Sequence, residues 1–227
     1  MSQFVSDTPN YAVVEEEPPE LSARTMVTGA HLWASATAFF FIDFLFAYFY
    51  LRSLNTGGMW RPKHVDASLT LGTLFTACVV AAAVAVWYGL QDERAGRRAA
   101  WRLKGAVALG LLVAALGLQI AEWSTQGFGP TDGAYASVYV GWTGMLFLFV
   151  IGTLFWLETV LATAIRYRNV PAGGRPPAGH ASGDPHRGRH DIADPLSLID
   201  PQLTAVSFYT SFIAVIAVIT WIILYLA

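Results

Sequence analysis

The chain has 227 residues, of which 55% are hydrophobic, 14% aromatic and 13% charged. Soluble domains carry about 25% charged residues, so this composition excludes an ordinary soluble globular protein. The formal net charge is −2 at pH 7, and no excess of basic residues points to nucleic acid as a partner. The single cysteine excludes an intrachain disulfide.

Five apolar stretches follow one another along the chain. A membrane-spanning helix needs ~20 apolar residues to cross the ~30 Å hydrocarbon core of a bilayer. The stretches of about this length are Val27–Leu51, Ser68–Leu90, Gly105–Ala121, Val138–Ile165 and Thr204–Leu226. The segments between them are too short to form a second core. We therefore predict an all-α, polytopic membrane protein with five transmembrane helices.

Changes in composition divide the chain into four parts. Residues 1–26 are acidic and contain proline, and residues 27–168 carry the first four helices. Residues 169–203 are rich in Gly, Pro and His, and residues 204–227 hold the fifth helix. The first part lacks the positive charge and early apolar core of a signal peptide, so the first helix is expected to remain in the mature protein. The third part is expected to form an extended cytoplasmic linker.

Three histidines in this linker, His180, His186 and His190, raise the question of a metal site. Their spacing of six and four residues has no helical scaffold, and no cysteine lies beside them. Structural metal sites usually combine His with Cys at close, regular spacing. A solvated linker is therefore the prediction, and metal binding is the alternative.

Lysine and arginine are unevenly distributed between the segments outside the predicted helices. Cytoplasmic segments of membrane proteins are enriched in these residues. The N-terminal tail and the segments after the second and fourth helices together hold eleven of them, and the other three segments hold three. We therefore predict a bundle with its N-terminus inside the cell and its C-terminus outside.

Small residues recur at helical spacing in two of the predicted helices. The rows are Ala77, Ala81 and Ala85 in the second helix, and Ala106, Gly110, Ala114, Gly117 and Ala121 in the third. Small residues allow helices to approach closely in a membrane. We expect both rows to contact other helices of this chain, and contact with a partner subunit is the alternative.

Few ionisable residues lie inside the predicted helices. Such a group at bilayer depth costs about 2.5–3.5 kcal/mol on insertion scales, which makes it a candidate functional group. The candidates are His31, Asp43, Glu122 with its neighbour Trp123, and Glu158. Asp43 is expected to face other helices, because Ala36, Ala47 and Tyr50 lie near it on the helix surface. Structural hydrogen bonding is its predicted role, and a proton path is the alternative.

The predicted helices contain no lysine or arginine in their cores. Asp43 therefore has no basic partner in this chain, and we expect it to be protonated, hydrogen-bonded or paired with another subunit. Redox cofactors lack ligands as well, because haem needs axial ligands and copper needs several His, Cys or Met side chains that converge. We predict no catalytic residue, no metal site and no cofactor in this chain. A small self-contained transporter is an alternative that the lack of internal repeats and of mid-helix prolines disfavours.

Four motifs occur in the same order as in a known protein family. The first helix contains SATAFFFIDFLFAYFYLR, and the third ends in LGLQIAEW (Leu116–Trp123). AYASVY (Ala134–Tyr139) and TGMLFLFVIGT (Thr143–Thr153) follow. Over residues 27–168 the chain resembles subunit III of haem–copper oxidases, in the five-helix bacterial form of that family.

The chain departs from the family pattern at several positions. Thr37 stands where the family has a carboxylate in its first shared helix, and Leu146 and Phe149 replace two histidines of the fourth-helix motif. Ser211–Ala217 align with the final-helix motif HFVDVVW and lack its His and Asp. The resemblance therefore implies the scaffold of the family, with much of its polar interior replaced by apolar groups.

The resemblance implies a non-catalytic accessory subunit in a bacterial inner membrane. Its partners would be membrane lipids, including bound phospholipid, and a large catalytic subunit that carries haem and copper. The residues expected to form hydrogen bonds within the chain or between subunits are His31, Thr37, Asp43, Glu122, Trp123 and Glu158. An accessory subunit of nitric oxide reductase, or of another membrane enzyme, is the alternative.

Overall fold

The protein is described by a computed structural model that places residues 19–55, 60–62, 65–166 and 199–226. These residues form the helices α1 Pro19–Ser53, α2 Leu69–Arg94, α3 Arg98–Thr125, α4 Ala134–Arg166 and α5 Ile199–Trp221. A π-helical turn, η1 (Ile222–Leu226), continues α5. No strand occurs in these ranges. Five helices are long and apolar enough to cross a membrane, which confirms the predicted all-α, multi-pass fold.

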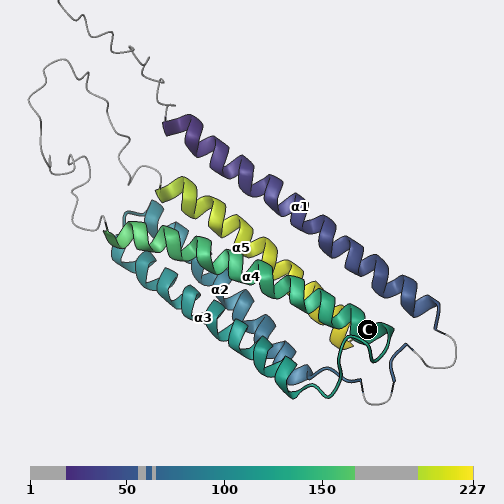
Figure 1. The fold of residues 1–227 in the computed structure, drawn as a ribbon. Helices are drawn as coiled ribbons and strands as arrows, with labels where there is room; N and C mark the ends of the chain where they lie inside the picture. Colours follow the sequence, from purple (N-terminus) through teal and green to yellow (C-terminus); the bar gives the residue numbers. More distant parts are fainter. Residues whose placement is uncertain (1–18, 56–59, 63–64, 167–198, 227) are drawn as a thin grey trace, which may run out of the picture.

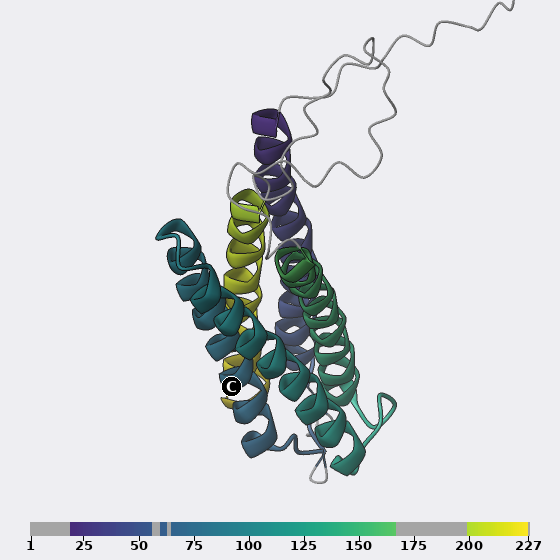
Figure 2. The same cartoon turned by 90° about the vertical axis from the view of Figure 1, so that its left-hand side faces the viewer.

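The five helices run side by side as a bundle (Figure 1). α5 contacts α1, α2 and α4, and α1 forms one edge of the bundle by packing on α5 and α4. α2 and α3 form an antiparallel pair on the side away from α1 (Figure 2). The start of α1 and the end of α5 lie at opposite ends of the bundle (Figure 1).

Local sequence explains several helix boundaries. Ser68 caps α2, because its Oγ accepts a hydrogen bond from the backbone N–H of Leu71 at 3.4 Å. The turn from α2 to α3 passes through Gly96, whose φ of 73° strongly favours glycine. The short turn that results makes α2 and α3 neighbours in an antiparallel hairpin.

Two helices begin earlier than the sequence analysis predicts. α1 starts at Pro19 and α5 at Ile199, inside the ranges 1–26 and 169–203 that were assigned to the tail and the linker. Proline is well tolerated in the first turn of a helix, where its missing N–H has no partner to lose. The rest of the linker, with its three histidines, lies outside the described residues.

The rows of small residues lie on the surface of the chain, so the prediction that they pack internally is wrong. The exposed members are Ala77, Ala81, Ala106, Gly110, Ala114 and Gly117, and Ala85 and Ala121 are half-buried. A Cβ added to Gly110 or Gly117 would meet nothing within 4 Å. Lipid tails and protein interior are equally apolar, so hydrophobicity alone does not distinguish the two environments.

The buried residues of α2 and α3 follow different rows, spaced alternately by three and four positions. The row in α2 is Gly72, Phe75, Val79, Ala82, Val86 and Gly89, beside which Ala83, Leu90 and Asp92 are also buried, and the row in α3 is Trp101, Gly105, Ala108, Leu112, Ala115, Gln119 and Glu122. This spacing averages 3.5 residues and suits helices that cross at a small angle of about 20°. The row in α3 carries two polar residues, Gln119 and Glu122, into the interior.

Candidate functional site

A buried polar cluster lies where the end of α3, the start of α4 and the turn η1 meet. The Glu122 side chain accepts hydrogen bonds from Tyr225 Oη, at 2.8 and 2.9 Å to its two oxygens, and from Gln119 Nε2 at 3.3 Å. Tyr139 Oη lies 3.2 Å from Tyr225 Oη. Tyr225 donates to Glu122, and the hydroxyls of Tyr139 and Tyr225 form a further hydrogen bond in which either can be the donor. We call Gln119, Glu122, Tyr139 and Tyr225 the Glu122 cluster.

Four elements of the chain build the Glu122 cluster. Gln119 and Glu122 are three residues apart on the buried row of α3, and both are 1% exposed. Tyr225 comes from η1, where the hydroxyl of Tyr135 donates to the carbonyl of Leu224 at 2.7 Å and holds the turn. α2 contributes Gly72, whose lack of a side chain leaves room for the Tyr225 ring. A Cβ on Gly72 would lie 2.3 Å from Tyr225 Cζ.

The donors around Glu122 compensate for the removal of its carboxylate from water. A hydrogen bond to a charged group contributes about 1.5–3 kcal/mol, and an unsatisfied buried group costs a comparable amount. Both oxygens of Glu122 have partners from this chain. The geometry of the Glu122 cluster therefore supports a structural role, which is to hold η1 against the ends of α3 and α4.

Trp123, the neighbour of Glu122, makes a separate connection between α3 and α4. Its Nε1 donates to Thr143 Oγ1 at 3.2 Å, and its ring lies 5.0 Å from that of Phe147. The Thr143 hydroxyl in turn donates to the carbonyl of Tyr139 at 2.7 Å. Glu122 and Trp123 thus both connect the end of α3 to the start of α4, through different contacts.

Thr37 forms a second buried polar contact, between α1 and α5. It is 2% exposed. Its Oγ1 donates to the carbonyl of Trp33 at 2.8 Å and lies 3.2 Å from Tyr209 Oη. Tyr209 and Tyr225 are separated by a rise of about 24 Å along the helix, so this contact is distinct from the Glu122 cluster.

The other three candidate residues lie on the surface of the chain. His31 stacks on Phe208 with 4.2 Å between ring centroids, and its Nδ1 lies 2.7 Å from the carbonyl of Val27. Asp43 and Glu158 are exposed and form no hydrogen bond or ion pair with any described residue. Asp43 therefore faces away from the other helices of this chain, contrary to the prediction.

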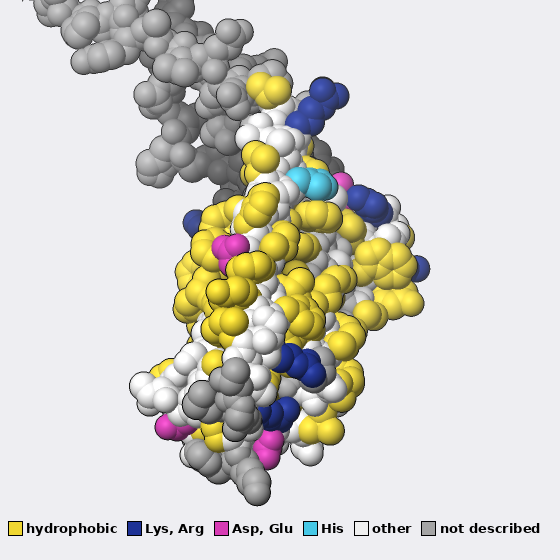
Figure 3. Space-filling view, turned by 90° about the vertical axis from the view of Figure 1, so that its right-hand side faces the viewer, with side chains coloured by type: hydrophobic (Ala, Val, Ile, Leu, Met, Phe, Trp, Pro, Cys, Tyr) yellow, Lys and Arg dark blue, Asp and Glu magenta, His cyan; other side chains and the backbone are white. Residues whose placement is uncertain are grey.

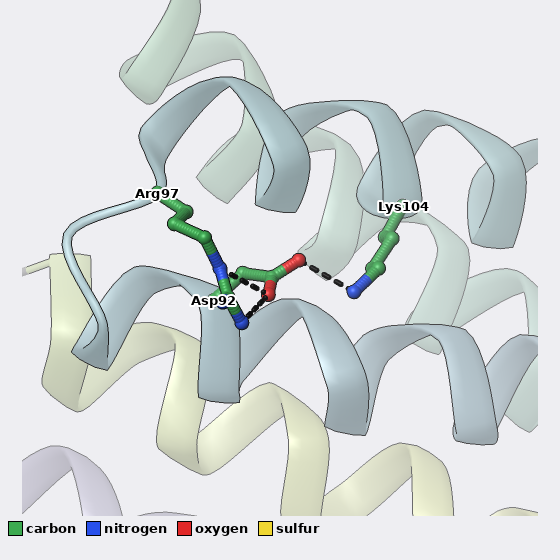
Figure 4. A network of polar contacts seen from close by, with 3 residues as sticks. All are labelled: Asp92, Arg97 and Lys104. Atoms are coloured by element: carbon green, nitrogen blue, oxygen red, sulfur yellow. Dashed lines mark hydrogen bonds and ion pairs between the residues drawn. The ribbon is translucent and has the colours of Figure 1, made fainter.

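An ion-pair network at the α2–α3 turn was missed by the sequence analysis. The Asp92 side chain is 3% exposed and accepts hydrogen bonds from Arg97 Nε at 3.0 Å, Arg97 Nη2 at 2.5 Å and Lys104 Nζ at 2.5 Å (Figure 4). The backbone N–H of Arg97 also donates to the carbonyl of Asp92 at 2.8 Å. The basic residues here were interpreted only as an orientation signal, although the acid among them was the available clue.

The described residues bring no three His, Cys, Asp or Glu side chains together as a group that could hold a metal ion. The contacts described above are hydrogen bonds and ion pairs that join the helices. The Glu122 cluster connects α3, α4 and η1, Thr37 connects α1 to α5, and Asp92 closes the α2–α3 hairpin.

Comparison with known proteins identifies the family of this helical bundle. The family model of cytochrome c oxidase subunit III matches residues 5–170. The chain belongs to the cytochrome c oxidase subunit III family. This confirms the family that the four motifs indicate.

Two curated relatives, both named cytochrome c oxidase subunit 3, come from Gallus gallus and Tachyglossus aculeatus aculeatus. The first is 30% identical over 150 residues, which cover 63% of this chain and 57% of the relative. The second is 30% identical over 141 residues, which cover 59% and 53%. The chain therefore spans somewhat more than half the length of these subunit III relatives.

The structure shows the surroundings of three residues that the sequence analysis expects to differ from the subunit III pattern. Leu146 is 1% exposed, and Phe149 packs against Phe40 and Phe41 with ring centroids 6.1 and 5.7 Å apart. The Thr37 hydroxyl is hydrogen-bonded to the Trp33 carbonyl and lies within hydrogen-bond distance of Tyr209 Oη. Apolar packing surrounds Leu146 and Phe149, and neutral hydrogen bonds satisfy Thr37.

Proposed function

We propose that this subunit III family member is a non-catalytic accessory subunit of a respiratory haem–copper oxidase in a bacterial cell membrane. The family match over residues 5–170 carries the proposal. The chain stabilises the large catalytic subunit and its lipid environment. The haem and copper belong to that partner.

Two features of the structure support a scaffold role. The buried side chains of Glu122, Thr37 and Asp92 all have partners inside the chain, so their contacts stabilise the bundle itself. The surface carries large apolar side chains, with Phe39 and Phe155 each 69% exposed. In a membrane such faces contact lipid or the helices of other subunits.

The proposed orientation places the start of α1 in the cytoplasm. The turn between α2 and α3 lies at the same end of the bundle as the start of α1 (Figure 1). That turn and the first residues of α3 carry Arg97, Arg98, Arg102 and Lys104. Positively charged connecting segments are retained on the cytoplasmic side, which supports this orientation.

Purification of the native complex tests the proposed function. The chain is given a C-terminal affinity tag, the membranes are solubilised in mild detergent, and untagged membranes serve as the control. The expected product has a haem spectrum and contains a large, many-helix catalytic subunit in a fixed ratio to this chain. A colourless preparation without a partner would contradict the proposal. A haem partner that reduces nitric oxide would retain the accessory role and overturn the oxidase assignment.

A further inference from the structure

α1 carries two rows of residues on opposite sides, each spaced alternately by three and four positions. The first row packs on α5 and α4 and comprises Ala30, Ala34, Thr37, Phe41, Phe44 and Tyr48. The second row, which we call the exposed seam, comprises Leu32, Ala36, Phe39, Asp43, Phe46 and Tyr50. Figure 3 shows this side of the molecule, where hydrophobic side chains cover most of the surface.

Asp43 sets the exposed seam apart from an ordinary lipid-facing surface. It is the only Asp, Glu, Lys or Arg among residues 32–51, and Arg52 follows it by a rise of about 13 Å. A position this far from the interface lies near the middle of a ~30 Å hydrocarbon core. Asp43 is exposed and has no partner among the described residues. Lipid tails are a suitable environment for the apolar residues of the exposed seam. They offer the Asp43 carboxyl group no hydrogen-bond or ionic partner.

Glu158, the other exposed carboxylate, is in a different situation. The preceding residues 134–157 contain no charged side chain and are numerous enough to cross the membrane by themselves. Glu158 therefore lies close to the membrane surface, where water solvates it. Of the two carboxylates, only Asp43 requires a partner at bilayer depth.

We propose that a transmembrane helix of another subunit packs along the exposed seam and places a Lys or Arg side chain beside Asp43. This inference rests on the proposed function, which supplies a complex with other membrane subunits. Charges inside membranes are typically paired with one another, and a cation at Asp43 would also lie between the rings of Phe39 and Phe46. The three-and-four spacing of the seam suits a second helix that crosses α1 at a small angle.

A second copy of this chain does not supply the required partner. In the described ranges no Lys or Arg occupies the middle of a helix, so a symmetric contact along the seam would bring two Asp43 carboxylates together without a cation. Two carboxyl groups that close carry at most one negative charge between them, and such a pair gives neither Asp43 a cationic partner. The partner is therefore a different chain with a basic residue at this depth.

Photo-crosslinking in the full complex tests the occupant of the seam. A photoreactive phenylalanine analogue replaces Phe39 or Phe46, and the control replaces Val113, which is 52% exposed on α3. The seam positions are expected to form adducts with one helix of a partner subunit that carries Lys or Arg within about one turn of the adduct, and Val113 is expected not to label that helix. A seam adduct with a second copy of the chain, with lipid alone, or with a helix lacking such a residue would overturn the proposal.

Substitution of Asp43 tests the charge. Asp43→Leu is expected to lower the fraction of the chain retained in the complex about tenfold or more, since the basic partner is left unpaired. Asp43→Asn keeps one hydrogen bond and is expected to cause a smaller loss. Glu158→Leu is the matched control and is expected to leave the fraction unchanged. Equal retention of Asp43→Leu and wild type, or equal losses from Asp43→Leu and Glu158→Leu, would overturn the proposal.

The two proposals fail in distinguishable ways. If the tagged wild-type chain purifies without any haem-containing partner, the proposed function is wrong and the inference about Asp43 falls with it. If the haem-containing complex is intact but the seam positions give no partner adduct, only the inference about Asp43 is wrong.

Discussion

Glu122 shows how a buried acid is tolerated in a bundle of apolar helices. The motif LGLQIAEW identifies Glu122 and Gln119 as polar residues on one side of a helix. It does not identify the main donor, Tyr225, which lies 103 positions away in the sequence and reaches Glu122 only through the fold. The residue could be predicted, but its partner could not, because the contact depends on how α5 ends.

Removal of the Tyr225 hydroxyl tests the Glu122 cluster. Tyr225→Phe keeps the ring but removes the donor that contacts both oxygens of Glu122, so we expect a loss of about 1–2 kcal/mol in the free energy of unfolding. Thermal unfolding of the purified protein in detergent measures this loss. Tyr88→Phe is the control, since Tyr88 is 50% exposed and its hydroxyl bonds no described residue. Equal melting temperatures for the two variants would contradict the structural role of the Glu122 cluster.

Gly72 is expected to be sensitive to the smallest substitution. A methyl group there would lie 2.3 Å from Tyr225 Cζ, and the ring cannot withdraw without breaking its hydrogen bonds to Glu122 and Tyr139. Gly72→Ala should therefore destabilise the protein by about 1–3 kcal/mol, as overpacking does. Gly110→Ala is the comparison, because its site on α3 is open and alanine favours helix. Equal melting temperatures for Gly72→Ala and Gly110→Ala would contradict this prediction.

Among the pairs of helices, α2 and α3 have the most extensive contacts in the bundle. Its turn combines Gly96 with the ion pairs of Asp92 to Arg97 and Lys104 (Figure 4). The carboxylate is almost completely covered while both cations remain partly accessible. Asp92 therefore holds the two helices together at their joined ends.

Asp92→Ala is expected to loosen this hairpin. The substitution leaves Arg97 and Lys104 without their shared acceptor, and we expect the melting temperature to fall by several degrees (about 2–4 °C for each kcal/mol in a domain of this size). Asp66→Ala is the control, since the Asp66 side chain is 70% exposed and its pair with Arg61 resembles surface ion pairs of small effect. Hydrogen exchange at the α2–α3 turn should also rise in Asp92→Ala only. Unchanged hydrogen exchange at the α2–α3 turn in Asp92→Ala would contradict this role of Asp92.

The sequence predicts the number and position of these helices well. It predicts less well which side of each helix is buried. Hydropathy and length locate five spans, and the structure contains five such helices. The small residues Ala77, Ala81, Gly110 and Gly117 are exposed, whereas Ala82 and Ala108 on the same helices are buried. Apolar residues on the two sides of a membrane helix are alike in hydrophobicity, so only the three-dimensional packing reveals the buried row. The same limitation led to the wrong orientation for Asp43.

Every second connection between consecutive helices lies at the same end of the bundle. The α2–α3 turn lies at the end where α1 starts, and the α3–α4 connection lies at the other end (Figure 1). The first carries a cluster of basic residues, and the second, residues 126–133, carries none. The distribution of charge therefore agrees with one direction of insertion.

Cysteine labelling tests the direction of insertion. In a Cys78→Ala background, Thr131→Cys is expected to react with a membrane-impermeant maleimide in intact cells, because the α3–α4 connection lies outside. Ala95→Cys, in the exposed α2–α3 turn, should react only after the membrane is opened. The reverse pattern would show that the proposed orientation is inverted.

We propose above that this chain stabilises a haem-containing catalytic partner. The most direct test compares the purified complex with the same complex isolated from cells that lack the chain. Haem absorbance and oxidase activity are followed over time at a fixed temperature in the same detergent and lipid. We expect a markedly shorter lifetime of both signals without the chain, and restoration of the lifetime when the chain is supplied again. Equal lifetimes with and without the chain would contradict the claim.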